Sequence, residues 1–134
     1  MTLNELFDTA GGRIRRYTPA EARAAAEVGA VIVDIRDGVS RDRDGVIPGA
    51  YHVPRTVLEW RVASDDYRNP DLEGKRLILV CDHGFSSVFA AAMLVDLGFD
   101  VGDVIGGFEA WQAAGLETTE PRPYDGQPGN GPPD

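Results

Sequence analysis

The sequence predicts a single α/β domain in which a central parallel sheet carries helices on both faces. Strand-like and helix-like segments alternate along the chain, which is typical of parallel strands joined by crossover helices. The strand-like segments 31–35 (VIVDI) and 77–80 (LILV) are apolar at both odd and even positions, as expected for strands covered on both faces. A length of 134 residues suits one domain with one hydrophobic core.

The first predicted helix covers 19–28. Thr18 is a suitable N-cap residue, Pro19 fits the first helical position, and Gly29 is a typical stop signal. The segment 31–35 follows as the first predicted strand, because it is short, apolar and rich in β-branched residues.

The middle of the chain alternates between loops and short elements. Residues 34–45 (DIRDGVSRDRDG) are polar and predict a loop, and a short strand is expected near 50–53 between two prolines. Thr56 is the expected N-cap of the helix that begins in TVLEWRVA, and residues 64–75 predict a connector. Trp60 in this helix and Trp111 near the end of the chain are both expected in the core.

The second half of the chain repeats the alternation. Strands are expected at 76–80 and 100–105, and helices at 86–97 and 108–115. The two ends are expected to lie outside the folded core. Residues 1–13 predict a flexible N-terminal arm, and the Pro- and Gly-rich residues 119–134 predict a disordered tail because they offer almost nothing to bury.

Composition and charge exclude several classes of partner. The net charge of −9 argues against nucleic acid and against anionic lipid, since both require clustered lysines and arginines. No apolar run reaches the ~20 residues of a membrane span. One cysteine and two histidines do not make a plausible metal cluster. A single cysteine cannot form an internal disulfide and no secretory segment is recognisable, so a cytoplasmic protein is expected.

The only cysteine, Cys81, stands where chemistry is expected in this class of fold. Ligands of open α/β sheets bind outside the carboxyl ends of the strands, and Cys81 directly follows the strand 77–80. The next helix begins near Ser86, so its unpaired N–H groups and positive dipole end face the sulfur and favour a thiolate. Cysteines at helix N-termini have pKa values lowered from about 8.5 to ~3.5–7.5. Gly84 allows the loop amides to converge on one point, as an anion-binding nest requires.

An isolated cysteine in such a domain is more often buried filler, because a thiol packs as a small hydrophobic group. A filler cysteine does not need the polar loop DHGFSS after it. The position of Cys81 and the composition of that loop therefore favour a reactive thiol.

Four motifs resemble the rhodanese domain in sequence, order and spacing. They are VIVDIRD, GVIPGAYHVP, the loop CDHGFSS and the closing VIGGFEAWQAAGL, and together they extend from about 14 to 116. The resemblance implies a rhodanese domain over 14–118, with a central parallel five-stranded sheet and helices on both faces. The loop is most similar to that of small single-domain thiosulfate sulfurtransferases, which carry a cysteine, a His-Gly pair and two serines in the same arrangement.

The resemblance implies a sulfurtransferase that acts without a cofactor. A cysteine thiolate of this family takes sulfane sulfur from a donor such as thiosulfate, becomes a persulfide, and passes the sulfur to cyanide or to a thiol, which a protein can supply. In this chain Cys81 would be the persulfide carrier. The amides of the loop residues Asp82, His83, Gly84, Phe85, Ser86 and Ser87 would hold its charge.

Individual loop residues have alternative roles. The hydroxyls of Ser86 and Ser87 would either donate to the sulfur or cap the following helix. His83 would either face the substrate or bind its neighbours. The family's strand-end pair corresponds to Asp34 and Arg36, for which a structural ion pair is expected.

Asp82 departs from what an anionic donor requires. Its negative charge lies next to the thiolate, disfavours ionisation of Cys81 and repels thiosulfate. A cation is expected to compensate. The candidates at the same strand ends are Arg41, Arg43, Arg55 and Arg61, each of which is otherwise explained as solvated surface charge.

Two alternative functions belong to other classes. The rhodanese fold includes phosphatases and arsenate reductases, whose loop is one residue longer and ends in an arginine, whereas the seventh residue counted from Cys81 is Ser87. The other alternative is a sulfur-carrying or regulatory module that docks onto a dedicated protein and turns over free thiosulfate poorly.

Overall fold

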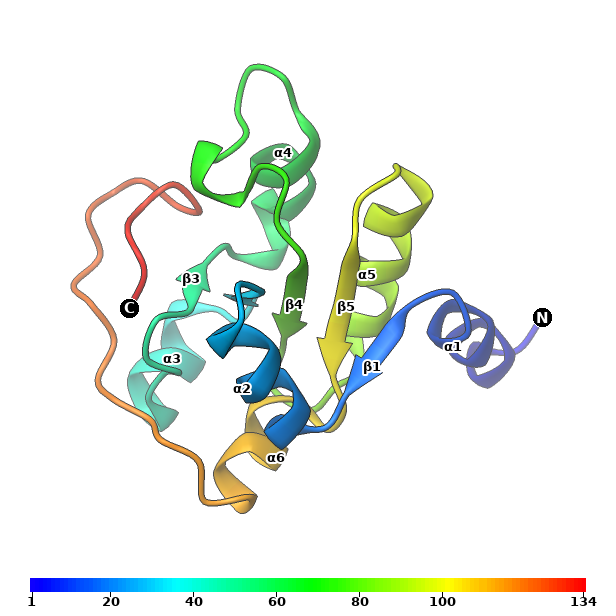
Figure 1. The fold of residues 1–134 in the computed structure, drawn as a ribbon, viewed down its shortest axis with the longest axis horizontal. Coiled ribbons are helices and arrows are strands. Elements are labelled where there is room, and N and C mark those ends of the chain that lie inside the picture. The colour runs from blue at the N-terminus through cyan, green and yellow to red at the C-terminus, as the bar shows by residue number, and fades with distance from the viewer.

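The computed structural model describes residues 1–134 and has the predicted parallel five-stranded sheet with helices on both faces (Figure 1). The strand order is β1-β5-β4-β2-β3, and every pair is parallel. The strands are β1 (Arg15–Tyr17), β2 (Val31–Asp34), β3 (Tyr51–His52), β4 (Leu77–Val80) and β5 (Val101–Val104). The helices are α1 (Leu3–Gly11), α2 (Pro19–Glu27), α3 (Gly38–Asp44), α4 (Leu58–Ala63), α5 (Ser86–Asp96) and α6 (Gly107–Ala113), with 3₁₀ turns η1 (Arg55–Val57) and η2 (Pro70–Leu72).

The central strand β4 is apolar at both odd and even positions because both of its faces are buried. Leu77 and Leu79 pack into the core layer beneath α4 and α5, whereas Ile78 and Val80 pack into the layer beneath α2 and α6. All four side chains are buried. Each fully buried side chain of this size contributes roughly 1.5–3 kcal/mol, so the two layers fix β4 and the residue that follows it.

Helix α2 begins as predicted. The Thr18 hydroxyl accepts a hydrogen bond from the Glu21 amide at 3.2 Å, and the Glu21 carboxylate accepts one from the Thr18 amide at 2.9 Å. The predicted cap Thr56 is wrong, because η1 occupies residues Arg55–Val57 and α4 then starts without a side-chain cap. Trp111 is buried, but Trp60 is 61% exposed, so the core prediction for Trp60 is also wrong.

The segment predicted as a loop at 34–45 contains helix α3. The Asp37 carboxylate caps it by accepting a hydrogen bond from the Ser40 amide at 2.8 Å. The sequence shows no apolar periodicity here, because the inner face of this short helix is made of Ser40 and Arg41, which are buried through polar contacts. Hydrophobic periodicity therefore does not reveal this helix.

Both ends of the chain have defined contacts with the domain in the structure. Within 1–13, residues Leu3–Gly11 form α1, which Thr2 and Glu5 cap reciprocally and which lies beside α5. Its Phe7 ring stacks edge-on against Phe85 and Phe89, with ring centroids 6.2 and 5.9 Å apart. The capping signal of this helix, Thr2 followed three residues later by Glu5, is present in the sequence.

The tail 119–134 crosses the side of the domain next to α3 and β3 (Figure 1). Thr119 forms an antiparallel bridge with Val46, and the carbonyls of Pro128 and Gly129 accept hydrogen bonds from Arg61 and Asn69. The structure thus gives this segment defined backbone contacts where the sequence predicted disorder. These contacts are polar and leave no hydrophobic pattern in the sequence. No helix in the structure combines the length and apolar character needed to cross a membrane.

Candidate active site

Cys81 directly follows β4 and lines a cleft of about 410 Å³ at the carboxyl ends of the strands. The thiol is only 5% exposed, so it lies at the bottom of the cleft. The cleft is enclosed by four loop residues besides Cys81 and by the segments that follow β2 and β3. These lining residues are Ile35, Arg36, Asp37, Pro54, Arg55, Thr56, Asp82, His83, Phe85 and Ser86.

The sulfur lies among hydrogen-bonding groups of its own loop. The Gly84 amide donates to Sγ at 3.2 Å, and Ser87 Oγ lies 3.2 Å from Sγ. Burial raises the pKa of the Cys81 thiol, but hydrogen bonds from the hydroxyls of Ser87 and Ser86 and from the amides of Ser87 and Gly84 outweigh it, so the pKa is lowered. The predicted activation of Cys81 therefore has a structural basis in the loop and in the first turn of α5.

Two glycines let the loop close around the sulfur. Gly84 has φ +79°, and a Cβ there would lie 2.6 Å from the Gly106 nitrogen. A Cβ on Gly107 would lie 2.4 Å from the Cys81 carbonyl oxygen. This close approach brings the start of α6 under the loop, where the Phe108 amide donates to the Cys81 carbonyl at 2.7 Å. The loop is consequently held in place by α6, the last helix of the chain.

Two functional residues were missed by the sequence reasoning. The Ser87 hydroxyl donates to Asp103 Oδ2 at 2.7 Å, and Arg16 donates to Asp103 from Nε at 2.9 Å and from Nη2 at 3.1 Å. Arg16 Nη2 also donates to the Gly84 carbonyl at 3.1 Å. The signal for Asp103 was present in the sequence, because a carboxylate in the middle of the apolar strand VGDVI requires a buried partner.

The remaining loop residues differ in what their side chains contact. Neither serine caps α5 through its side chain, because the N-cap position is occupied by Phe85. His83 Nδ1 lies 2.6 Å from Glu109 Oε2 on the exposed rim, so it binds a neighbour. Asp82 accepts a hydrogen bond from the Ser40 hydroxyl at 3.2 Å, which ties the loop to α3.

Of the four candidate arginines, only Arg55 lines the cleft. It is partly exposed and pairs with Glu59 one helical turn away. Arg41 is buried in an ion-pair network away from the cleft, and Arg43 pairs with Asp44 on the surface. Arg61 donates to the carbonyls of the tail and of its own connector. Arg41, Arg43 and Arg61 thus bind other partners and do not line the cleft, whereas Arg55 does.

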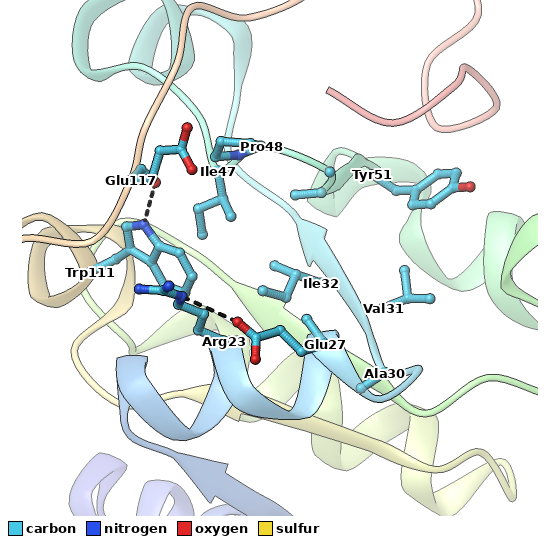
Figure 2. A pocket seen from close by; sticks show the side chains of 13 residues that line it. Arg23, Glu27, Ala30, Val31, Ile32, Ile47, Pro48, Tyr51, Trp111 and Glu117 are labelled. Carbon is cyan, nitrogen blue, oxygen red and sulfur yellow. Dashed lines mark hydrogen bonds and ion pairs between the residues drawn. The ribbon is translucent and has the colours of Figure 1, made fainter.

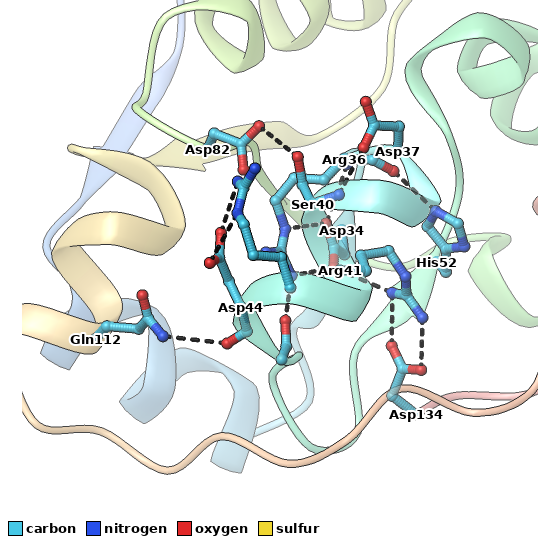
Figure 3. Close-up of polar contacts among 12 residues, drawn as sticks. Asp34, Arg36, Asp37, Ser40, Arg41, Asp44, His52, Asp82, Gln112 and Asp134 are labelled. Carbon is cyan, nitrogen blue, oxygen red and sulfur yellow. Dashed lines mark hydrogen bonds and ion pairs between the residues drawn. The ribbon is translucent and has the colours of Figure 1, made fainter.

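The strand-end pair Asp34 and Arg36 forms the expected ion pair (Figure 3). Arg36 donates from Nε and Nη2 to the two Asp34 oxygens at 3.0 and 2.9 Å, and from Nη2 to the Gly45 carbonyl at 2.8 Å. Both side chains are buried, and the guanidinium lies 3.8 Å from the centroid of the Phe108 ring. His52 Nε2 lies 2.8 Å from the Arg36 carbonyl oxygen. This network fixes the loop that forms one wall of the cleft.

A second hollow of about 320 Å³ lies between α2, β2 and α6 (Figure 2). Ile32 and Ile47 form part of its apolar lining, and Trp111 lies at one side with its indole N–H donating to the Glu117 carbonyl at 2.9 Å. It contains none of the predicted site residues and no nucleophile. The chemistry of the molecule is therefore concentrated in the Cys81 cleft.

Comparison with known proteins supports the geometry. Residues 18–114 match the family model described as the Rhodanese-like domain. The chain belongs to this rhodanese-like family. It is 43% identical over 100 residues to the thiosulfate sulfurtransferase GlpE of Pseudomonas syringae pv. syringae (strain B728a), an alignment that covers 73% of this chain and 87% of that relative. The GlpE of Pseudomonas putida (strain KT2440) is 45% identical over 101 residues, with 74% and 86% covered.

Solved rhodanese-like structures share the fold. A protein of Rhodopseudomonas palustris CGA009, described as a protein of unknown function and possible tyrosine phosphatase, superposes with a TM-score of 0.79 at 34% identity and covers 88% of this chain and 94% of that one. The thiosulfate sulfurtransferase of Pseudomonas aeruginosa superposes with a TM-score of 0.62 at 26% identity over 81% of this chain and 20% of that one. This rhodanese-like chain is thus similar to proteins whose names indicate two different reactions.

Proposed function

We propose that this rhodanese-family protein is a sulfurtransferase that carries sulfane sulfur on Cys81 as a persulfide. The single observation that carries the proposal is the position of the Cys81 sulfur at the bottom of the cleft, 3.2 Å from the Gly84 amide nitrogen and 3.2 Å from the Ser87 hydroxyl. The Gly84 amide donates to the sulfur, and a donor in this place stabilises negative charge both on the thiolate and on the terminal sulfur of a persulfide.

The first half-reaction is a displacement at sulfur. The Cys81 thiolate attacks the outer sulfur of the donor, the new S–S bond forms as the donor's bond breaks, and the leaving group departs with the electron pair. With thiosulfate the leaving group is sulfite. No external oxidant or reductant is needed, because the sulfur is already at the sulfane level.

The second half-reaction reverses the roles. A thiolate or cyanide attacks the outer sulfur of the persulfide, and Cys81 leaves as a thiolate, which the same donors stabilise. Cys81 is the only cysteine of the chain, so no second thiol in the same molecule can resolve the persulfide as a disulfide. The acceptor must therefore come from another molecule, and a protein thiol is the proposed class.

For the donor we propose thiosulfate, the substrate named for the GlpE relatives. Arg55 is the cleft cation that is available to hold its sulfonate oxygens. Asp37 and Asp82 line the same cleft and oppose a dianion. These two carboxylates support an alternative within this proposal, a carrier module that receives sulfur from a less charged persulfide donor on a protein partner. A free thiol that must stay reduced also supports a cytoplasmic location.

The similarity to the Rhodopseudomonas protein, described as a possible tyrosine phosphatase, raises phosphate ester hydrolysis as a second candidate. The loop of this chain opposes it. The position where the longer phosphatase loop carries an arginine is Ser87, which is buried and bonded to Asp103. A thiol bonded to this hydroxyl lacks the bidentate grip that a phosphoryl group needs in its transition state.

The test measures transfer of a sulfur atom from thiosulfate to Cys81 and then to cyanide. The purified protein is incubated with thiosulfate, its intact mass is recorded, cyanide is added and thiocyanate is measured, with Cys81→Ser in parallel. A gain of one sulfur atom that cyanide removes, absent from the variant, is the expected result. A wild-type protein that gains no sulfur from thiosulfate or from a low-molecular-weight persulfide, or that hydrolyses p-nitrophenyl phosphate in a Cys81-dependent manner, would contradict it.

A further inference from the structure

We propose that Asp103 is a positioning residue that governs, through the Ser87 hydroxyl, how readily Cys81 gives up its proton. The inference rests on the proposed function only in taking Cys81 as the nucleophile. The observation behind it is a closed circuit of hydrogen bonds beneath the reactive loop. The circuit runs from Cys81 to Ser87, from Ser87 to Asp103, from Asp103 to Arg16, from Arg16 to Gly84, and from Gly84 back to the sulfur.

The circuit comes from four parts of the fold, and its members other than Arg16 are buried. Asp103 lies on β5, directly paired with Leu79 of β4, which is two residues before Cys81. Ser87 belongs to the first turn of α5, and both Asp103 and Ser87 have 0% exposed surface. Arg16 comes from β1, and its guanidinium is covered by the Phe7 ring of α1 at 5.5 Å from the centroid. Solvent therefore reaches the Arg16 side chain, which is 24% exposed, but not Asp103 or Ser87.

One hydroxyl proton has two competing acceptors. Ser87 Oγ lies 2.7 Å from Asp103 Oδ2, and a carboxylate can only accept, so the hydroxyl hydrogen points to Asp103. Oγ then turns its lone pairs towards Sγ at 3.2 Å, where it can accept an S–H but cannot donate to a thiolate. In this orientation Ser87 stabilises the thiol. Once the hydroxyl rotates towards the sulfur, it stabilises the thiolate instead.

Arg16 makes that rotation possible. Its Nε donates to Asp103 Oδ1 at 2.9 Å and its Nη2 donates to Oδ2 at 3.1 Å. Asp103 therefore keeps hydrogen bonds at both oxygens when Ser87 turns away. A buried carboxylate left with no donor would resist the rotation, because an unsatisfied buried charge is destabilising. The Arg16–Asp103 pair thus lowers the cost of turning the hydroxyl from Asp103 to the sulfur.

Other charged groups also face Cys81 and are unchanged by the substitutions below. They are Asp82 and His83 in the loop, Glu109 at the start of α6, and Arg36, Asp37 and Arg55 across the cleft. None of them contacts the Ser87 hydroxyl. A change that passes through Ser87 is therefore separable from a general change of charge in the cleft.

The test is the pH dependence of the alkylation rate of Cys81 in wild type and in Asp103→Asn. The amide oxygen accepts from Arg16 Nε and the amide N–H₂ donates to Ser87 Oγ, while Arg16 Nη2 loses its bond to Oδ2 and keeps the Gly84 carbonyl. The hydroxyl hydrogen then turns to the sulfur, and a negative charge near the thiolate is removed. The profile of the variant is expected to shift to lower pH. Below the midpoint of the pH profile the alkylation rate should rise about threefold, because more of the thiol is ionised. On the high-pH plateau the rate should fall about threefold, because a less basic thiolate is a weaker nucleophile.

Two further variants show whether Ser87 transmits the effect. In a Ser87→Ala background, Asp103→Asn is expected to produce a much smaller shift. Asp100→Asn is the matched control, because Asp100 pairs with Arg76 on the exposed surface just before β5 and should leave the profile unchanged. If Asp103→Asn does not fold, Arg16→Lys serves instead. This substitution removes one of the hydrogen bonds that Arg16 donates to Asp103. Asp103 then keeps the hydrogen bond from the Ser87 hydroxyl, so the pH profile of Cys81 alkylation should shift to higher pH.

The outcomes separate this inference from the proposed function. An Asp103→Asn profile that superposes on wild type, or an equal shift with and without Ser87, overturns the positioning role even if sulfur transfer is normal. A shift that requires Ser87 supports the positioning role even in a protein that accepts no sulfur from thiosulfate. Measuring alkylation and sulfur loading on the same preparations therefore tests each statement separately.

Discussion

Arg41 and Asp134 form a doubly hydrogen-bonded ion pair that joins helix α3 to the last residue of the sequence, with Nη1–Oδ2 and Nη2–Oδ1 distances of 2.9 Å (Figure 3). Arg41 also donates to Asp34, and all three side chains are buried. Asp134→Ala leaves Arg41 with one carboxylate, so we expect the free energy of unfolding to fall by roughly 2 kcal/mol. Chemical denaturation measures it.

The control for this pair is Asp125→Ala, which removes the same charge from an exposed position in the tail. A surface change of this kind should stay within about 0.5 kcal/mol. Equal stability of the two variants would show that the tail does not contribute to the folded state in solution.

The pKa of Cys81 is lowered, because hydrogen bonds from Ser87, Ser86 and Gly84 outweigh the effect of burial. The alkylation rate with iodoacetamide should therefore reach half its maximum below about pH 8.5, the value for a free cysteine, and fall tenfold per pH unit further down. In the unfolded state the thiol keeps its ordinary pKa, so the thiolate contributes stability above that pKa, which is lost as pH falls through the folded value. A midpoint at or above that of a cysteine peptide measured alongside would contradict the described loop.

Gly84 and Gly74 both have positive φ, of +79° and +71°, but only Gly84 is crowded. Alanine at Gly84 places a Cβ 2.6 Å from the Gly106 nitrogen, whereas nothing lies within 4 Å of a Cβ at Gly74. Gly74→Ala should cost about 1–2 kcal/mol of stability and leave sulfur loading intact. Gly84→Ala should cost more and reduce loading at least tenfold, because the loop amide moves off the sulfur. Similar loading in both variants would argue against the loop as the charge-stabilising element.

Asp82 is the loop carboxylate closest in sequence to the nucleophile, and Asp42 is an exposed carboxylate on α3. Asp82→Asn removes a charge that repels a dianionic donor, so kcat/KM for thiosulfate should rise about threefold to tenfold at low salt. The gain should shrink as ionic strength increases. Asp42→Asn changes the net charge equally and should have little effect. An equal gain in both variants would assign the effect to the overall charge of the protein.

Arg55 and Arg43 are both partly exposed arginines paired with a neighbouring carboxylate, but only Arg55 lines the cleft. Arg55→Gln should raise KM for thiosulfate about tenfold with a small change in kcat, because a charged hydrogen bond to the donor is lost in the ground state and the transition state alike. Arg43→Gln is the matched control. Unchanged steady-state kinetics in Arg55→Gln would remove Arg55 from donor binding.

The sequence alone predicts the features that depend on local residue patterns or on the resemblance of its motifs to a known family. The apolar runs at 31–35 and 77–80 predicted buried parallel strands, and Thr18 and Pro19 marked the start of α2. Cys81 was assigned from its position between a strand and a helix, which is also where the structure places the cleft. Both kinds of signal are contained within a few neighbouring residues.

What the sequence did not reveal depends on contacts between distant segments. Arg16 and Asp103 are 87 residues apart and meet because β1 and β5 are neighbours in the sheet. The sequence is compatible with Arg41 as a solvated surface cation, whereas in the structure Arg41 is buried between the carboxylates of Asp34 and Asp134. Pairing of this kind follows from strand order, which propensity and periodicity do not determine.

The support that α6 gives to the Cys81 loop ties the reactivity of the thiol to the completion of the fold. The Phe108 amide that holds the Cys81 carbonyl is synthesised 27 residues after the cysteine itself, and β5 is made in between. Until α6 is present, the Cys81 loop lacks the Phe108 hydrogen bond and the close packing against Gly107. The lowered pKa of Cys81 is therefore a property of the completed domain and not of the loop sequence alone.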